Sequence, residues 1–130
     1  MSIVAKYGEL WARNPENIEA ILGSREGGTG VYILYDGSMP VYIGRGKIRQ
    51  RIRRACASKR RGQYWDHFSW YALRNPGLSR EIEALLLRML PFYLRALNRQ
   101  RGALNGAKKY RQVDEVAEPV RRPKLLRRAK

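Results

Sequence analysis

The stretch that decides the fold of this chain is residues 30–44, which reads GVYILYDGSMPVYIG. Residues 31–35 and 41–43 are rich in β-branched and aromatic side chains, as is typical of strands. Asp36-Gly37 lies between the two runs and favours a tight turn. The pattern predicts a β-hairpin that brings two tyrosines and two glycines to one edge of a sheet.

The chain that follows the hairpin predicts a helix, a strand and a second helix. Apolar residues recur at helical spacing from Lys47 to about Arg60. Residues 68–73 alternate in the manner of a third strand. Ser79 is suited to cap the next helix, whose apolar stripe runs to Leu90.

Residues 1–28 are expected to form an N-terminal helical segment packed on the core. The support is Asn14-Pro15, where a cap residue and a proline mark the start of a helix. Residues 29–112 then form the core of a single domain. Residues 113–130 are expected to form a loose basic tail.

The formal charge of +16 is concentrated in two blocks. Residues 31–65 hold nine basic and one acidic side chain, and residues 99–130 hold eleven and three, so each block is +8. Like charges at this density repel one another unless a polyanion relieves the repulsion. Nucleic acid is the polyanion that this pattern favours, because its phosphates release counterions on binding. Charge alone leaves open a solvated basic surface, or a ribosome-type protein without an active site.

The remaining composition excludes several classes of protein. A single cysteine, Cys56, excludes an internal disulfide and fits a reducing compartment, and its place on an apolar helix face makes it a core residue. No apolar run approaches the roughly 20 residues that span a bilayer, so we expect no membrane partner. We expect a cytoplasmic, nucleoid-associated protein, with the nucleus also compatible. The sequence does not determine the oligomeric state.

Five sequence elements, in order, resemble the GIY-YIG nuclease family. They are Gly30-Val31-Tyr32, Tyr42-Ile43-Gly44, Arg51, Glu83 and Asn98. The resemblance covers residues 29–105. It implies an α/β (α+β) fold with a small three-stranded antiparallel sheet flanked by helices. It also implies an endonuclease that hydrolyses DNA phosphodiester bonds with a divalent metal ion.

The resemblance also implies a role for each residue. Tyr32 is the general base or passes a proton to one, and Tyr42 orients the water or a phosphate oxygen. Arg51 stabilises the charge of the transition state. Glu83 holds Mg²⁺ or Mn²⁺, and Asn98 makes amide hydrogen bonds that hold the active-site helix.

Elementary chemistry makes these roles reasonable. An arginine offers fixed donors that do not deprotonate. One carboxylate together with waters and substrate phosphate is a common way to hold magnesium. A free tyrosine titrates near pH 10, so it needs cationic neighbours. The residues expected to supply that field or to contact DNA are Gly44, Arg45, Lys47, Arg49, Arg53 and Arg54.

One departure from the family pattern concerns the helix after the hairpin. Many members carry histidine or tyrosine one turn after the arginine, where this chain has Ala55. His67, beside Asp66, is a candidate replacement with a catalytic role. A lone histidine among aromatic residues is more often a structural hydrogen-bonding residue, so both roles stay open for His67.

Two of the site residues have rivals in the sequence. Glu81 rivals Glu83 as the metal ligand, and Asn105 rivals Asn98, although Asn105-Gly106 is more typical of a turn.

The expected partner is DNA, duplex or branched, with a further protein as one source of specificity. A second function is also compatible with these residues, namely a non-catalytic nucleic-acid-binding protein that retains the nuclease fold.

Overall fold

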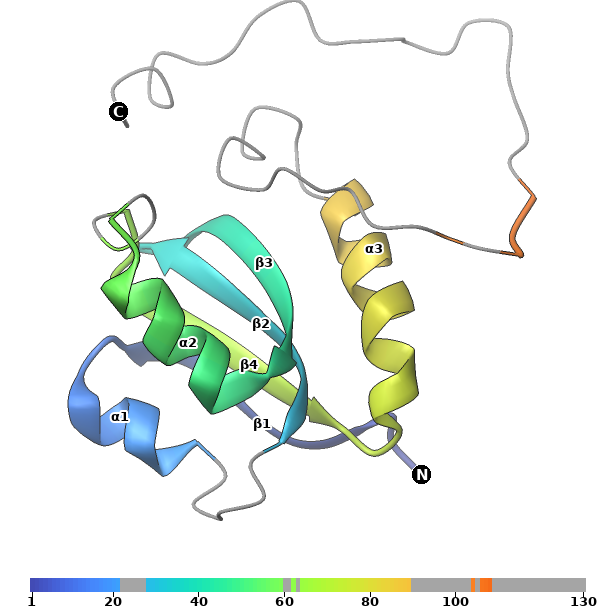
Figure 1. Ribbon diagram of the computed structural model, residues 1–130, viewed down its shortest axis with the longest axis horizontal. Coiled ribbons are helices and arrows are strands. Elements are labelled where there is room, and N and C mark those ends of the chain that lie inside the picture. Colours follow the sequence, from blue (N-terminus) through green and yellow to red (C-terminus); the bar gives the residue numbers. More distant parts are fainter. Residues whose placement is uncertain (22–27, 60–61, 63, 90–103, 105, 109–130) are drawn as a thin grey trace, which may run out of the picture.

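The computed structural model describes residues 1–21, 28–59, 62, 64–89, 104 and 106–108. The fold is mixed α+β, with a four-stranded antiparallel sheet in the order β1-β4-β2-β3 (Figure 1). The elements are β1 (Val4–Ala12), α1 (Pro15–Ala20), β2 (Thr29–Asp36), β3 (Met39–Lys47), α2 (Ile48–Ala57), β4 (His67–Leu73), the short 3₁₀ helix η1 (Pro76–Leu78) and α3 (Ser79–Met89).

The expected hairpin is confirmed as β2 and β3. Tyr32 lies opposite Gly44, and Leu34 lies opposite Tyr42. Gly37 forms the turn with a φ of 65°, a backbone conformation that glycine adopts without steric cost. Both strands extend beyond the apolar runs, because Gly30 continues the pairing opposite Gly46.

The expectation of three strands and a wholly helical N-terminal segment is wrong. Residues 4–12 form β1, which pairs with β4 and makes the fourth strand of the sheet. Tertiary packing explains the difference, because Trp11 makes edge-on contacts with Phe68 and Trp70 of β4. Within the described residues of the segment, the helical part is α1, where Asn14 accepts a hydrogen bond from the amide of Asn17 as a cap.

Helices cover both faces of the sheet. α1 and α2 lie over one face, in front of the sheet in Figure 1. α3 packs on β2 and β3 and is seen beside β3 in the same view. The first face carries the larger core, and the second carries a smaller one. The larger core includes Ile18, Ile21, Tyr32, Leu34, Ile48, Ile52, Ala55, Phe68 and Trp70, and the smaller one includes Ile33, Ile43, Leu86 and Leu87.

The two helices after the hairpin lie where their patterns predict them, but the apolar stripe predicted for α3 is only partly correct, because Leu85 and Met89 are exposed whereas Ala84 and Leu87 are buried. Ile48, Ile52 and Ala55 are buried along α2, and Cys56 is packed against the same core. α3 begins at Ser79, directly after η1. Within the described ranges, none of the helices has the length and hydropathy of a membrane span. The expected tail, residues 113–130, lies outside the described part of the chain.

Candidate active site

The space beside the glycine of the second motif is occupied by the tyrosine of the first. Gly44 on β3 lies directly opposite Tyr32 on β2. A Cβ atom at Gly44 would lie 2.4 Å from the Tyr32 Oη and 2.5 Å from its Cζ. The absence of a side chain at Gly44 therefore allows the Tyr32 phenol to lie across β3. This explains physically why the second motif ends in glycine.

A second glycine, two residues further along β3, makes room for the helical arginine. A Cβ atom at Gly46 would lie 2.8 Å from Nε of Arg51. Gly46 also has a φ of 128°, which other residues rarely adopt. Successive side chains of a strand alternate between faces, so Gly44 and Gly46 share a face. Tyr32 and Arg51 are thus placed side by side over β3.

Glu83 approaches the same strand from the other helix. Its Oε1 is 3.3 Å from Nε of Arg45, the residue between the two glycines. The Glu83 side chain is 16% exposed. Burial raises the pKa of the Glu83 carboxyl, while the charges of Arg45, Arg51 and Arg80 oppose that rise. Glu83 is therefore a partly buried carboxylate within electrostatic reach of three guanidinium groups.

The topology of the sheet explains how these groups meet. Arg45 points toward α3, whereas Tyr32 and Arg51 lie on the face covered by α2. Among the residues that the structure describes, β3 is an edge strand of the sheet. The charge of Arg51 acts on Glu83 across that edge. Tyr32 and Arg51 thus lie beside Gly44 and Gly46 on one face of β3, and Glu83 meets Arg45 on the other face, in the same half of the hairpin.

Tyr42 lies beside Tyr32. Their ring centroids are 6.1 Å apart, with an angle of 35° between the rings. Tyr32 is 4% exposed, whereas Tyr42 is only partly buried. Of the two phenols, Tyr42 is the one that solvent reaches in this structure.

The residues expected to contact DNA divide into two groups. Arg49 donates a hydrogen bond to the carbonyl of Ile21, and Arg53 pairs with Glu19. These two arginines attach α2 to α1 and its C-terminal cap. Of the other basic residues, Lys47 and Arg54 are exposed, and Arg45 is engaged with Glu83.

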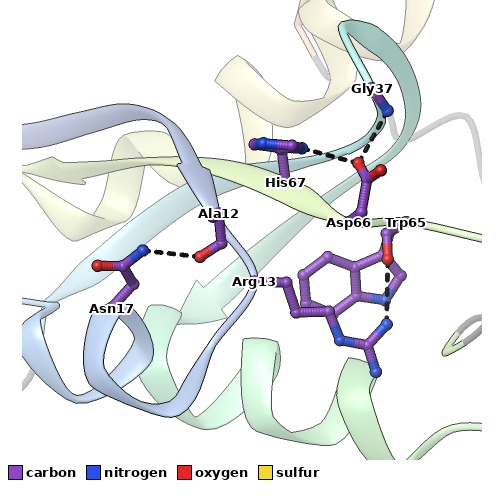
Figure 2. Close-up of polar contacts among 7 residues, drawn as sticks. All are labelled: Ala12, Arg13, Asn17, Gly37, Trp65, Asp66 and His67. Carbon is purple, nitrogen blue, oxygen red and sulfur yellow. Dashed lines mark hydrogen bonds and ion pairs between the residues drawn. The ribbon is translucent and has the colours of Figure 1, made fainter.

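His67 lies at the other end of the hairpin. It pairs with Tyr35 near the β2–β3 turn, about 17 Å along β2 from the level of Gly46, from the rise of a strand. Its Nδ1 is 2.8 Å from Oδ1 of Asp66, which accepts a 2.8 Å hydrogen bond from the amide of Gly37 (Figure 2). The expected contact with Asp66 is present, but the structure does not bring His67 to the group around Glu83.

The arrangement near Asp66 is part of a structural network. Figure 2 shows Arg13 beside Trp65, with the guanidinium carbon 4.2 Å from the centroid of the ring. Arg13 also donates hydrogen bonds to the carbonyl oxygens of Trp65 and Gly62. These hydrogen bonds fix the segment that leads into β4, and so they fix the position of Asp66 at the turn of the hairpin.

The remaining candidates are resolved in part. Glu81 is exposed on α3, and Glu83 is the acid that contacts β3. Asn98 and its rival Asn105 lie outside the described residues. Sequence reasoning missed Gly46. Its spacing of two residues from Gly44 is the signal that places both on one face of a strand.

Glu83 suits a divalent cation as a single ligand. A carboxylate has acceptor capacity beyond its contact with Arg45, and the side chain is not fully enclosed. Among the described residues, no group of three or more His, Cys, Asp or Glu side chains is placed to hold a metal ion. The fit is therefore that of one carboxylate whose partners are water and phosphate, which is common for magnesium.

Comparison of the chain with protein-family models, curated proteins and solved structures gives no match. What the fold and the site define together is a small α+β protein with a basic, one-carboxylate cluster at the edge of its sheet.

Proposed function

We propose that this protein is an endonuclease that hydrolyses DNA phosphodiester bonds with the help of a divalent metal ion. The observation that supports the proposal is that three consecutive residues of β3, Gly44 to Gly46, each contact or make room for a proposed site residue. Gly44 and Gly46 make room for Tyr32 and Arg51, and Arg45 between them anchors Glu83. Glycine inside a strand weakens the strand and often marks the close approach of another group, and here the groups that approach are Tyr32 and Arg51.

Arg51 and Glu83 have different electrostatic roles in this proposal. The transition state of phosphodiester hydrolysis gathers negative charge, and the Arg51 guanidinium stabilises that charge with fixed donors. Arg51 lies over Gly46, which holds it at the edge of the sheet. Glu83 would hold the Mg²⁺ or Mn²⁺ ion, which polarises the phosphate and stabilises the leaving oxygen.

Tyr32 is assigned to accept the proton of the attacking water or to pass it to a general base, and Tyr42 is assigned to orient that water. Tyr42 is the phenol nearer to solvent, and its ring adjoins that of Tyr32. In this proposal Tyr42 contacts the water, and Tyr32 is oriented by its packing across Gly44.

DNA is expected to lie along the exposed basic residues next to this cluster. Lys47 and Arg54 are exposed on β3 and α2, and neither is engaged in an ion pair among the described residues. Contacts of this kind with phosphates carry no sequence information and weaken as salt rises. The protein is therefore expected to bind duplex or branched DNA by its backbone, with a protein partner as one source of specificity.

Supercoiled plasmid provides the test. Wild-type protein is incubated with plasmid and Mg²⁺ or Mn²⁺, with and without a chelator, and nicked product is measured on a gel. We expect metal-dependent nicking that Glu83→Ala abolishes while DNA binding persists. Glu81→Ala is the matched control on the same helix and should nick at the wild-type rate. Equal cutting by Glu83→Ala and wild type would contradict the assignment.

The burial of Tyr32 favours one second function, a nucleic-acid-binding protein that keeps the nuclease fold without catalysis. A phenol that is 4% exposed is packed like a core residue. That function predicts DNA binding with no nicking under any metal condition. Since both functions predict a steep loss of affinity with salt, only the cleavage assay separates them.

A further inference from the structure

Strands β1 and β4 together expose an aromatic surface that the proposed nuclease site does not use. Tyr7 of β1 lies opposite Tyr71 of β4, on the face of the sheet away from α1 and α2. α3 packs on the β2 and β3 side of that face. The two side chains, here called the tyrosine pair, therefore lie beyond the helix, next to the outer edge of the sheet.

The geometry of the tyrosine pair presents a flat ring to solvent. The ring centroids of Tyr7 and Tyr71 are 5.8 Å apart and the rings are nearly parallel, at 11°. Tyr7 is 60% exposed, although one of its ring faces lies against Tyr71. Its opposite ring face is therefore available to a planar ligand. An exposed aromatic ring that is already oriented by a stacked neighbour loses little conformational freedom when it binds.

Two basic side chains near the tyrosine pair favour an anionic ligand, and one acidic side chain opposes it. Burial raises the pKa of the Tyr71 phenol, and Tyr35, Glu9 and Tyr7 raise it further, so the phenol stays neutral at physiological pH. Lys6 precedes Tyr7 within β1 and Arg74 follows β4; both are exposed, and the Arg74 guanidinium donates a hydrogen bond to the carbonyl of Ser2. Glu9 is the negative charge that acts on Tyr71. Its removal should strengthen the binding of an anion, whereas removal of the Tyr7 ring should weaken it.

We propose that the tyrosine pair binds unpaired bases of a single DNA strand. Bases stack on aromatic rings without regard to sequence, and a basic chain draws in the phosphates that connect them. The net charge of +16 is concentrated in residues 31–65 and 99–130 and not in β1 or β4, so it favours a polyanion as the partner of the chain as a whole. A duplex buries its base faces within its own stack, so only an unpaired segment offers a ring to Tyr7.

One part of this inference rests on the proposed function: that the unpaired strand belongs to the DNA molecule that the nuclease cuts. β1 is three strand spacings from β3, which corresponds to about 15 Å across the sheet. A strand stacked on the tyrosine pair therefore leaves the neighbouring duplex within reach of the edge that holds Glu83. The substrate class that follows is DNA with an unpaired segment beside a duplex, such as a flap or a branch.

Binding is measured by fluorescence anisotropy with a labelled oligothymidine and with a blunt duplex of equal length, without metal. We expect Tyr7→Ala to weaken oligothymidine binding about tenfold, which corresponds to about 1.4 kcal/mol, and to weaken duplex binding less than about twofold. Tyr7→Phe keeps the ring and should restore the single-strand affinity. Glu9→Gln should strengthen it by about twofold, because it removes a charge that opposes the phosphates.

Ile3→Ala is the matched control, since Ile3 is an exposed apolar residue of the same segment outside the tyrosine pair. It should leave both affinities unchanged, and thermal unfolding should show that each variant is folded. An equal loss of single-strand and duplex binding in Tyr7→Ala would overturn the inference, as would no loss at all. A wild-type dimer that Tyr7→Ala dissociates, seen by light scattering, would also overturn it by assigning the surface to a second copy.

The two proposals fail in different ways. If the wild type never nicks DNA but the single-strand affinities change as expected, the proposed function fails and the base-binding surface stands. If nicking depends on Glu83 but a flap and a blunt duplex are cut equally by wild type and Tyr7→Ala, the base-binding surface fails and the proposed function stands.

Discussion

The two ends of the β2–β3 hairpin each hold a carboxylate beside a basic side chain, but the two carboxylates have different surroundings. At the open end, Glu83 is partly buried beside Arg45 and within reach of the charge of Arg51. At the turn end, Asp66 is exposed and accepts hydrogen bonds from His67 and from the amide of Gly37. Burial raises the pKa of Glu83, whereas hydrogen bonding by His67 and Gly37 lowers the pKa of Asp66.

The two carboxylates differ in burial and in the direction of their pKa shifts, and the proposed function assigns chemistry to the end that holds Glu83. The groups around Asp66 satisfy the carboxylate and hold a turn, as a structural network does. The groups around Glu83 place a carboxylate in a desolvated position with an excess of positive charge. Perturbed carboxylates of that kind are concentrated at functional sites. An acid beside a basic residue in the sequence is therefore not informative until its burial is known.

The largest effect should separate Arg51 from His67. We expect Arg51→Ala to lower the rate of metal-dependent plasmid nicking by about 100-fold or more, since removal of one preformed donor to a developing oxyanion costs about that much. His67→Ala should change the rate by less than about twofold, because His67 lies at the turn end. Initial rates at saturating DNA measure both. A larger loss in His67→Ala than in Arg51→Ala would reverse the comparison between the two ends.

A smaller effect is expected on the free energy of unfolding when each of the two hairpin glycines is replaced by alanine. Gly44→Ala places a Cβ atom against the Tyr32 phenol and should lower the free energy of unfolding by about 2 kcal/mol through overpacking. Gly37→Ala meets no atom within 4 Å but must hold a φ of 65°, which costs about 1 kcal/mol. Urea denaturation of both variants measures the difference. Nicking should fall only in Gly44→Ala, and an equal fall in both would show that Tyr32 is not the group displaced.

The smallest effect concerns the pH dependence of stability at the turn end. The pKa of Asp66 is lowered in the folded protein, chiefly by its hydrogen bond with His67, so its ionised form stabilises the fold. That contribution is present above the ordinary pKa of 3.8 and is lost as the pH falls through the lowered value. Asp66 is exposed, so the effect is small.

Asp66→Asn provides the measurement. The variant should be less stable than the wild type at about pH 6 and should converge with it toward about pH 3, in thermal unfolding at constant ionic strength. A difference that stays constant across this range would show that the charge of Asp66 plays no part. Nicking at neutral pH should be unaffected, in contrast to the Glu83→Ala variant.

Local patterns predicted much of the fold correctly. The hairpin, α2 and α3 each carry their periodicity within a short window, so the sequence is sufficient to place them. β1 was missed because its evidence is a partner far along the chain. Trp11 contacts Phe68 and Trp70, and a strand pairing of that separation has no local signature.

The candidate site was predictable in its residue types but not in its contacts. Tyr32, Arg51 and Glu83 were identified from their order along the chain, through a family resemblance. Gly46 and the Arg45–Glu83 ion pair were not, because each joins elements that approach only in the folded protein. Arg53 was expected to face DNA, but Glu19 of α1 pairs with it.

The sequence by itself determined a hairpin with glycines at fixed positions, two amphipathic helices and a large positive charge, because periodicity, turn chemistry and net charge are properties of neighbouring residues. Only the tertiary structure decided which acid meets the edge strand and that His67 stays away from it. It also decided that a fourth strand, β1, stacks its Tyr7 on Tyr71 of β4. The physical reason is that burial and cross-strand register depend on segments far apart in the chain, and they determine which charges and rings come within reach of one another.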